Sequence, residues 1–469
     1  FDGLANQNYE LPLILDLDGR HCLYDFESSV LKYSIDEGSL VNFSPYVEFQ
    51  EFSEILFDGR ELINEENNEL GNLELNKSYD LEIRTNDETN NFSLIFTSIP
   101  TIQIVTLNKV VKEPKTLARM IVNHPETDES PDDNWVGIEY RGASSLEFDK
   151  KSYGLEVYTG KSMYTELSRS YFDLNQNHKW IMDAMFVDYG RLRNKTTFEL
   201  WNSMGDSESH IGIGSQFVEV FVNQESRGLY SFNEIYTEEF LNLNNESVFY
   251  KGADNSVVTK FNELPEEDPF SAEWGEWEQV FPNPSQEIVW DDFSILSELI
   301  VEGSDSEFEN EIANLIDLDN VIDYYLFVNL FYGYDNVGKN WYFLKRDNTS
   351  KFQIVPWDLD ATWGRNHRGN EMTKTYTVKN GFFDRLIELD PENYNQRLKE
   401  RWNQLRGSVF SEFNLFALFG DNFSELEAYK IIDVENNIWN SAVNLSHEQT
   451  YIETWISSRL NYLDAKFQH

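Results

Sequence analysis

A change in hydrophobic pattern near Pro100 limits what this chain can fold into more than any other feature of the sequence. Residues 1 to 98 contain short runs in which apolar and polar residues alternate, such as VEFQEF and YDLEIRT, and turn residues separate these runs. Alternation with a period of two places successive side chains on opposite faces of a strand. We therefore expect residues 1–99 to form a small all-β module, an antiparallel sandwich of the immunoglobulin-like kind.

Beyond Pro100, strand patterns come first and helical patterns follow. TIQIVTL is typical of a strand, and FVEVFVN and GLYSFNEIY are typical of a hairpin. Residues 262–295 are polar, and we interpret them as an insertion or lid. The chain is thus expected to be α+β, with one domain over 100–469 that is β-rich to about 255 and helical from about 296. Helices are predicted over 188–205, 305–315, 318–332, 380–389, 391–406, 409–418 and 447–467.

The composition excludes several classes of function. The 469 residues include 37 Lys and Arg against 83 Asp and Glu, and the resulting net charge of −46 opposes binding to nucleic acid or anionic membranes. A site for phosphate groups would therefore need local cations or a metal ion. Cys22 is the single cysteine, so we expect neither a disulfide framework nor a cysteine-based zinc site. No apolar run approaches the roughly 20 residues that span a bilayer, and we expect no signal peptide.

Four polar residues flank a predicted β-hairpin. Asp335 and Asn340 precede the strand NWYFLKR, and Asp358 and Asp360 follow the strand KFQIVPW. Protein kinases have the same order: a catalytic Asp, a metal-binding Asn five residues later, a hairpin and a metal-binding Asp. Mg²⁺ needs only a few protein oxygens, and acids directly after an apolar strand are costly to bury without a cation. Ordinary turn residues at these positions are the alternative.

An earlier strand supplies a candidate lysine for phosphate. In DKKSYGLEV, alternation places Lys151 on one face with Tyr153, Leu155 and Val157, and Lys150 is the neighbouring candidate. A lysine that points inward needs an anion, which an ATP phosphate or a helix carboxylate would supply. A lysine in solvent at a sheet edge is the alternative.

The predicted helix 188–205 contains further candidates. Glu199 is placed to pair with Lys151, as a helix glutamate pairs with the phosphate lysine in kinases, or it is a surface acid. Arg191 and Arg193 either hold phosphate or pair with local acids.

Several blocks of the sequence, taken in order, resemble the spore coat protein H (CotH) kinase family. They lie within about residues 100–466 and are IEYRGASSLEFDKKSYGLEV, DYGRLRNKTTFELWNSMG, FVEVFVNQESRGLYSFNEIY, VFYKG, NWYFLKR and VPWDLDATWG. The resemblance implies an atypical protein-kinase-like fold. It also implies that ATP and Mg²⁺ (or Mn²⁺) are used to phosphorylate Ser or Thr on secreted or coat proteins.

Carried over to matching positions, the resemblance gives each candidate a role. Asp335 resembles the catalytic Asp, and Asp358, Asn340 and Asp360 resemble the metal ligands. Lys151 resembles the phosphate-contacting lysine. The sequence has no GxGxxG loop, so RGASS must cradle phosphate differently. The further nucleotide-binding candidates are Lys150, Glu199, Arg193 and Glu234, the last at the position of a hinge that faces adenine.

The resemblance also bears on location and leaves two other functions open. The β module is similar to sandwich domains that precede CotH-like domains in secreted or lipid-anchored bacterial proteins, which implies an extracytoplasmic location and a secreted or surface protein as substrate. We expect no nucleic-acid partner and no membrane span. A kinase-like fold kept only for binding or surface assembly is one alternative. A carbohydrate-active enzyme is the other, because 12 Trp and 24 Tyr suit sugar stacking and two carboxylates suffice for a glycosidase.

Overall fold

A computed structural model of the chain describes residues 9, 14–51, 53–85, 88–126, 131–142, 144–266 and 269–468. The chain divides into two compact units, each made of separate segments. The first unit comprises Phe1–Phe186, Ser215–Ile235 and Ser424–Val443, and the second comprises Val187–Gly214, Tyr236–Phe423 and Asn444–His469. The chain therefore leaves the first unit and returns to it more than once.

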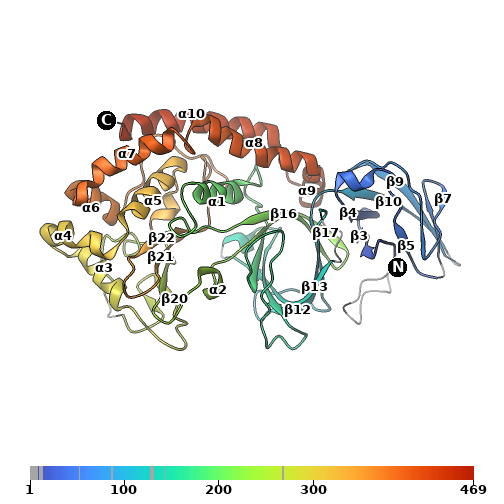
Figure 1. Cartoon of the computed structure of the whole chain (residues 1–469), viewed down its shortest axis with the longest axis horizontal. Coiled ribbons are helices and arrows are strands. Elements are labelled where there is room, and N and C mark those ends of the chain that lie inside the picture. The colour runs from blue at the N-terminus through green and yellow to red at the C-terminus, as the bar shows by residue number, and fades with distance from the viewer. Residues whose placement is uncertain are drawn as a thin grey trace. The chain divides into compact units, whose positions relative to one another are not determined.

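Two β-sheets around one apolar core form the N-terminal module (Figure 1). Their strand orders are β2-β1-β5-β8 and β3-β4-β10-β9-β6-β7. Leu17 and Val47 from one sheet and Leu31 and Phe96 from the other are fully buried in the shared core. The strands are β1 (Asp16–Leu17), β2 (Arg20–His21), β3 (Leu23–Asp25), β4 (Val30–Ser34), β5 (Tyr46–Glu48), β6 (Glu54–Phe57), β7 (Arg60–Glu61), β8 (Glu66–Asn67), β9 (Ser78–Arg84) and β10 (Thr89–Thr97).

The expectation of a purely antiparallel module was wrong for one pair of strands. β10 runs parallel to β4, with Leu94 opposite Leu31 and Phe96 opposite Tyr33. Parallel neighbours need a long connection between them, and here the chain passes through five further strands before β10 returns to β4. Local alternation predicts that a segment is a strand, but it does not predict which distant strand lies beside it.

A closed seven-stranded barrel follows the module and belongs to the same unit (Figure 1). Val136, Ile138, Leu155 and Val157 lie in its core, in positions that alternate along β13 and β14. Closure removes the exposed edges of a sheet. The barrel order is β11 (Thr101–Val105), β12 (Thr116–Asn123), β13 (Asp132–Arg141), β14 (Ser152–Tyr158), β15 (Lys179–Asp183), β17 (Glu225–Asn233) and β16 (Ser215–Val222). The predicted β16–β17 hairpin is confirmed.

A buried ion pair connects the module to the barrel. Lys32 of β4 places its Nζ 2.7 Å from both carboxylate oxygens of Glu219 of β16. The Glu219 side chain is fully buried, and Ser226 donates a further hydrogen bond of 2.9 Å to it. Since a buried charge without a partner is strongly unfavourable, each of the two charges depends on the other.

The second unit contains the five-stranded sheet β19-β20-β18-β21-β22 and most of the helices. Its strands are β18 (Val248–Gly252), β19 (Glu273–Trp274), β20 (Trp277–Phe281), β21 (Trp341–Lys345) and β22 (Gln353–Pro356). The predicted hairpin of β21 and β22 is confirmed. Residues 262–295, interpreted as an insertion or lid, supply β19 and β20 to this sheet, and Trp274 and Trp277 are buried.

The predicted helices of the C-terminal part are present, but the one expected over 409–418 is longer and spans Glu412–Tyr429. The helix expected over 188–205 begins only at Arg193, because Asp188 accepts the backbone N–H groups of Leu192 and Arg193 ahead of the first turn. The sequence patterns did not predict α3 and α9. The helices are α1 (Arg193–Ser203), α2 (Glu238–Leu241), α3 (Asp291–Val301), α4 (Asp305–Leu315), α5 (Leu318–Phe331), α6 (Gly381–Leu389), α7 (Tyr394–Arg406), α8 (Glu412–Tyr429), α9 (Ile431–Trp439) and α10 (Leu445–Phe467).

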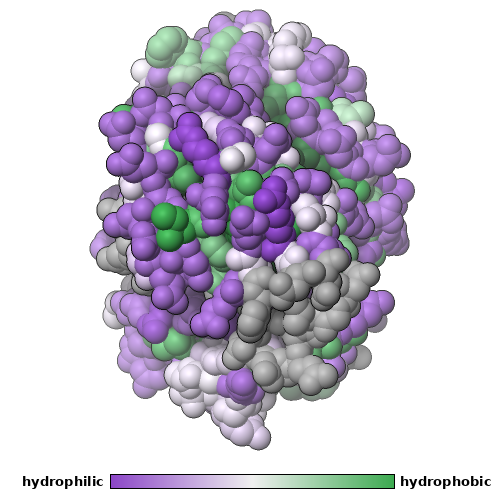
Figure 2. Space-filling model, turned by 90° about the vertical axis from the view of Figure 1, so that its right-hand side faces the viewer, coloured by the Kyte–Doolittle hydropathy of each residue, from purple (hydrophilic) through white to green (hydrophobic). Residues whose placement is uncertain are grey.

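The surface agrees with the acidic composition. Figure 2 shows a face on which hydrophilic residues predominate and hydrophobic side chains occur singly or in small groups. Within the described residues, no helix has the length and apolar character needed to cross a membrane.

The Lys32–Glu219 pair gives a test of how the module is held. We expect Lys32→Met to lower the free energy of unfolding by about 3–5 kcal/mol, because it leaves the Glu219 carboxylate buried without a cation. Combining Lys32→Met with Glu219→Leu should recover most of this loss. Lys77→Met, which removes an exposed pair with Glu74, is the control and should cost less than about 1 kcal/mol. Urea unfolding curves measure all four proteins, and equal losses in Lys32→Met and Lys77→Met would contradict the assignment.

Candidate active site

One carboxamide in the second unit holds the two ends of the β21–β22 hairpin together. Asn336 lies in a short 3₁₀ helix (Tyr334–Val337) and is buried. Its Nδ2 donates to the carbonyl oxygens of Asn340 (3.2 Å) and Trp357 (2.8 Å). The Trp357 N–H also donates to the Asn340 carbonyl at 3.0 Å. These bonds hold Asn340 opposite Trp357, the residue before Asp358. Asn340 and Asp358 therefore lie close together although they are far apart in sequence.

The predicted metal ligands sit on backbone with unusual geometry. Asn340 and Asp358 have positive φ angles of 59° and 51°, a region that Asn and Asp tolerate better than most residues. Asn340 is buried, Asp360 is half-buried and Asp358 is exposed. The turn that carries the two acids is fixed by Asn194 of α1, whose Oδ1 accepts the Leu359 N–H at 2.9 Å. Asn and Asp at these positions are therefore explained by the backbone conformation as well as by the predicted role as metal ligands.

Asp335 is half-buried in the same 3₁₀ helix. Its Oδ1 accepts a hydrogen bond of 3.2 Å from Asn255, and its Oδ2 lies 3.9 Å from His367 Nδ1. Burial first, and then the negative charges of Asp335 and Asp360, raise the pKa of the Tyr334 hydroxyl. Because the charges of both carboxylates raise the pKa of the same Tyr334 hydroxyl, Asp335 and Asp360 lie near each other. The structure brings the four predicted catalytic and metal residues to one end of the hairpin, and their roles stay predictions.

The donors around the hairpin fit a magnesium or manganese ion in kind. Asn340, Asp358 and Asp360 offer only oxygen ligands, which Mg²⁺ prefers, and it keeps several waters alongside one or two carboxylates. Three acidic or imidazole ligand atoms within 4.8 Å of one another occur, among the described residues, only at Glu156, Glu166 and His178 in the barrel. There Lys115 lies 2.8 Å from Glu156 and supplies the positive charge already.

Arg193 is committed to a buried network in the second unit. Its side chain is fully buried and pairs with Asp188, while its Nη2 lies 2.5 Å from Glu448 and its Nε 3.0 Å from the Thr362 carbonyl. Burial by itself raises the pKa of Asp188, but the Arg193 charge and the backbone N–H groups lower it further, and the net shift is downward. Every nitrogen of the guanidinium has a hydrogen-bond partner in this network. The prediction that Arg193 contacts nucleotide is therefore wrong, and Arg193 instead fixes the start of α1.

Glu199 does not have the partner that we expected. Its carboxylate forms an ion pair of 2.5 Å with Lys195, which lies one helical turn earlier. It also accepts a hydrogen bond of 2.7 Å from the side-chain amide of Asn422. Spacing of four residues on a helix favours such a pair. The expected partner, Lys151, forms its contacts elsewhere.

The two candidate lysines lie just before β14 in the first unit. Lys151 precedes the strand and donates to the carbonyl oxygens of Leu146 (2.7 Å) and Phe148, so it does not continue the inward face of Tyr153. Lys150 is the inward lysine. Its Nζ is fully buried and lies 2.8 and 2.9 Å from the carboxylate oxygens of Glu435 in α9.

The anion that an inward lysine requires is therefore a helix carboxylate. Lys150 also lies 4.4 Å from the centre of the Tyr230 ring, and Glu435 accepts the Leu229 N–H at 3.1 Å. This pair fixes α9 against β17. Glu234, one residue after β17, is fully buried, and its carboxylate accepts the Asn175 N–H at 2.5 Å. Its proposed place at an adenine-facing hinge stays a prediction.

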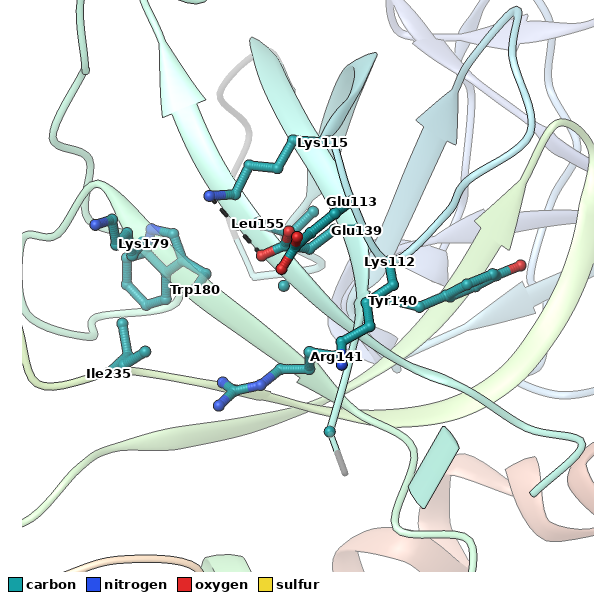
Figure 3. Close-up of a pocket in the computed structure, with 12 residues that line it drawn as sticks. Lys112, Glu113, Lys115, Glu139, Tyr140, Arg141, Leu155, Lys179, Trp180 and Ile235 are labelled. Carbon is teal, nitrogen blue, oxygen red and sulfur yellow. Dashed lines mark ion pairs between the residues drawn. The ribbon is translucent and has the colours of Figure 1, made fainter. Parts of the chain in front are cut away.

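A pocket on the barrel gathers cations that the sequence reasoning missed. It has a volume of about 320 Å³, and Lys112, Lys115, Arg141 and Lys179 line it beside the apolar Trp180 (Figure 3). Leu155 and Ile235 are further apolar lining residues, and Glu113 and Glu139 are its carboxylates.

Arg141 and Lys112 are the two cations of this pocket that have no close partner among the described residues. The Arg141 guanidinium extends across the view in Figure 3, and among the described residues it forms neither a hydrogen bond nor an ion pair. It does act on the buried Asp183, whose pKa is raised by burial in spite of the arginine charge. Gly142 follows with φ of 108°, and a Cβ there would lie 1.8 Å from Ser145 Oγ, so the turn requires glycine.

Comparison with known proteins identifies the family. The sequence model described as CotH kinase protein matches residues 138–463, which is more than half of the chain. The chain belongs to the CotH kinase family. The predicted resemblance to this family is thereby confirmed.

A curated relative and a solved structure extend this finding. The inner spore coat protein H of Bacillus subtilis (strain 168) is 23% identical over 338 residues, which cover 70% of this chain and 86% of the relative. The crystal structure of the Helicobacter pylori proinflammatory kinase CtkA matches with a TM-score of 0.28 and 10% identity, covering 64% of this chain and 94% of that chain. A TM-score of that size carries no argument about the fold.

Sequence reasoning about this CotH-family chain missed Arg141 although it quoted the block that contains it. Two signals were present. RG stands at the end of a strand, just before the loop to the next strand, and a cation at such a place is notable in a chain with net charge −46. Analogy with ordinary kinases favours a lysine for phosphate, and the KK pair that follows offers one.

The Asp188–Arg193 pair predicts how stability depends on pH. Because the folded-state pKa of Asp188 is lowered, the pair contributes stability above the unfolded pKa of about 3.9, and this contribution is lost as the pH falls through the folded value. We expect Asp188→Asn to lower the urea midpoint at pH 7, with the difference from wild type shrinking below about pH 4. Asp206→Asn, an exposed carboxylate that also accepts backbone N–H groups, should change the midpoint much less. A difference that grows on acidification would contradict the sign.

Proposed function

We propose that this chain transfers the γ-phosphoryl group of ATP to a Ser or Thr hydroxyl of a protein. The observation that carries the proposal is the pair of hydrogen bonds from Asn336 to the Asn340 and Trp357 carbonyls. They join the loop that contains Asp335 to the turn that contains Asp358 and Asp360. Phosphoryl transfer depends mainly on such positioning and on charge stabilisation.

Asp335 is the proposed catalytic group. Asn255 donates to its Oδ1, and its Oδ2, which lies 3.9 Å from His367 Nδ1, is the oxygen proposed to accept the proton of the substrate hydroxyl. As that O–H bond breaks, the hydroxyl oxygen bonds to the γ-phosphorus, and the bond from phosphorus to the leaving ADP oxygen breaks. Asp335 orients the hydroxyl and holds its proton.

Asn340, Asp358 and Asp360 are the residues that would hold Mg²⁺ or Mn²⁺. When bound, the ion neutralises phosphate charge as it develops. In a chain with net charge −46, this neutralisation also offsets the repulsion that ATP meets at an acidic surface. Asn336 and Asn194 fix the backbone from which these oxygens project.

Within the first unit, Arg141 replaces Lys151 as our candidate for a phosphate-binding cation. Arg141 is unpaired in a pocket with three lysines, whereas Lys151 donates to two backbone carbonyls. Guanidinium groups suit phosphate because two N–H groups can bond one phosphate at once. Ile235, next to the proposed hinge residue Glu234, lines the same pocket.

We further propose an acceptor and a location. A protein named inner spore coat protein H is 23% identical to this chain, and its name supports the proposal that this chain acts outside the cytoplasm, on a secreted or surface protein. The acidic composition favours a substrate with basic character around its hydroxyl residue.

A non-catalytic binding module is the second candidate function. It is favoured by the contacts of the two candidate lysines. Lys150 forms a buried ion pair with Glu435, and Lys151 donates hydrogen bonds to carbonyl oxygens. Under this alternative the chain binds neither nucleotide nor metal at the hairpin.

Two substitutions separate these possibilities. With labelled ATP, Mg²⁺ or Mn²⁺ and a Ser-rich basic peptide, we expect Asp335→Asn to reduce transfer at least 100-fold while nucleotide affinity changes little, since a catalytic proton acceptor contributes about 10²–10⁴ in rate. Asp358→Ala should weaken metal-dependent ATP binding itself. The proposal fails if wild type neither incorporates label nor binds ATP better than Asp358→Ala.

Arg141 and Lys151 predict different results in nucleotide binding. We expect Arg141→Gln to weaken ATP binding about tenfold or more, because a charge-assisted hydrogen bond is worth about 1.5–3 kcal/mol. Lys151→Gln should change affinity by less than about threefold. Arg60→Gln, on the exposed strand β7, is the matched control for charge. Isothermal titration measures all three, and the reverse ranking of Arg141 and Lys151 would return the role to the lysine.

A further inference from the structure

A second cavity lies at the opposite end of β13 from Arg141. It has a volume of about 300 Å³ and is lined by the end of β12, the start of β13, the loop 170–173 and Arg20 of β2. β13 runs for ten residues from Asp132 at this cavity to Arg141 at the other pocket, a span of roughly 30 Å at 3.3 Å per residue. The cavity is therefore distinct from the proposed nucleotide site.

The cavity is placed at a mouth of the barrel. Tyr171, which lines it, also packs its ring at 5.3 Å from Trp180 and 5.8 Å from Phe232 within the barrel core. Barrel mouths are frequent binding sites for small molecules, and 300 Å³ is at the lower end of the usual size of such sites. One or two sugar rings fit a volume of this order.

Two polar atoms on cavity residues have no partner. Among the described residues, nothing forms a hydrogen bond with the Tyr171 hydroxyl or with Asn123 Oδ1, although both atoms are sealed from solvent. The Asn123 Nδ2 is satisfied, since it donates 3.1 Å to Thr101. Buried polar groups without partners are rare in folded proteins, and each one needs an explanation. A bound molecule that reaches them by a small side-chain movement would supply it.

The charges around the cavity select against anions. Glu126, Asp132 and Asp173 are exposed carboxylates on its rim, and Arg20 is its single arginine. The Arg20 guanidinium is partly used, since it donates to the His124 carbonyl at 3.4 Å. Phosphate or carboxylate ligands would meet net repulsion here. The carboxylates instead accept hydrogen bonds from O–H groups.

Two rings add an apolar surface to this polar rim. The rings of His124 and Phe172 lie 5.6 Å apart and are tilted by 36°. Glu126 donates its N–H to His124 Nδ1 at 3.2 Å, which places the proton of the neutral ring on Nε2. Phe172 and Asp173 both have positive φ angles, 53° and 60°. This is a strained conformation for a bulky residue, and such strain is found preferentially at functional sites.

We propose that this barrel-mouth cavity binds a neutral carbohydrate of one or two residues. Sugar hydroxyls match carboxylate and amide acceptors, and the C–H faces of a sugar ring pack on aromatic rings. The proposal concerns binding, not cleavage, and it does not depend on the proposed kinase function. It gives the chain a means of holding a glycan while a separate site acts.

The test uses the full chain and defined probes. Glucose, N-acetylglucosamine and maltose are the neutral probes, glucosamine is the cationic probe and glucose 6-phosphate is the anionic probe. Saturation-transfer NMR detects binding and isothermal titration gives the dissociation constant. We expect at least one neutral sugar to bind with a millimolar or tighter constant and glucose 6-phosphate to bind at least tenfold more weakly than glucose. If none of the neutral sugars binds, or if glucosamine or glucose 6-phosphate binds more tightly than they do, the proposal is overturned.

Two variants link binding to the cavity. Asp173→Ala changes an exposed rim residue and should weaken sugar binding about tenfold, whereas Asp149→Ala, exposed and outside the cavity, should leave it unchanged. Tyr171→Phe removes only the unpaired hydroxyl and should weaken binding several-fold without lowering the melting temperature. Tyr153→Phe, in the same barrel core but outside the cavity, is its control. Equal affinity in Asp173→Ala and wild type would show that the sugar binds elsewhere and would end the proposal, even if Tyr171→Phe failed to fold.

Discussion

The Asn336 side chain is the constraint on which the candidate active site depends. One carboxamide bonds to the carbonyl groups at both ends of the β21–β22 hairpin. Without these bonds, the loop of Asp335 and the turn of Asp358 would be joined only through the strands and through the bond from the Trp357 N–H to the Asn340 carbonyl. Because Asn336 is buried, its hydrogen bonds meet little competition from water, and loss of either acceptor would leave a buried donor unsatisfied. The positions of four polar residues thus depend on a fifth that takes no part in the chemistry.

Two groups of cations in this acidic chain have different surroundings. Lys32, Lys150 and Arg193 are paired with buried carboxylates and hold strands or helices together within their own units. Arg141 and the lysines near it line a pocket instead. Since buried pairs are costly to break but not necessarily stabilising compared with apolar residues, the first group accounts for structural specificity. The second group is what an acidic protein needs if it is to receive a phosphate chain.

The barrel offers two separate sites on one scaffold. Arg141 ends β13 at the cation-lined pocket, and Asp132 begins the same strand at the carboxylate-lined cavity. The two differ in the sign of their charges, so they would select ligands of different chemistry. A closed barrel suits this arrangement, because its core of apolar side chains keeps both ends at a fixed separation.

The sequence alone determined the elements and the family. Strand patterns in the sequence predicted β11, β13, β14, β16 and β17 of the barrel but not β12 and β15. The 3.6-residue pattern predicted α4 and α5 to within a residue, and the predicted hairpin between Asn340 and Asp358 is present. These features depend on residues that are close together in the chain, so local patterns contain them.

Only the tertiary structure decided the partners of the charged residues. Glu199 pairs with Lys195, Lys150 pairs with Glu435 from a helix almost 300 positions later, and Arg193 is enclosed by Asp188 and Glu448. It also decided that β4 lies parallel to β10, and that Lys151 donates to backbone carbonyls whereas Arg141 has no close partner among the described residues. The physical reason is that a charge takes the nearest partner that the fold supplies, and which partner is nearest depends on packing between segments that no local pattern relates.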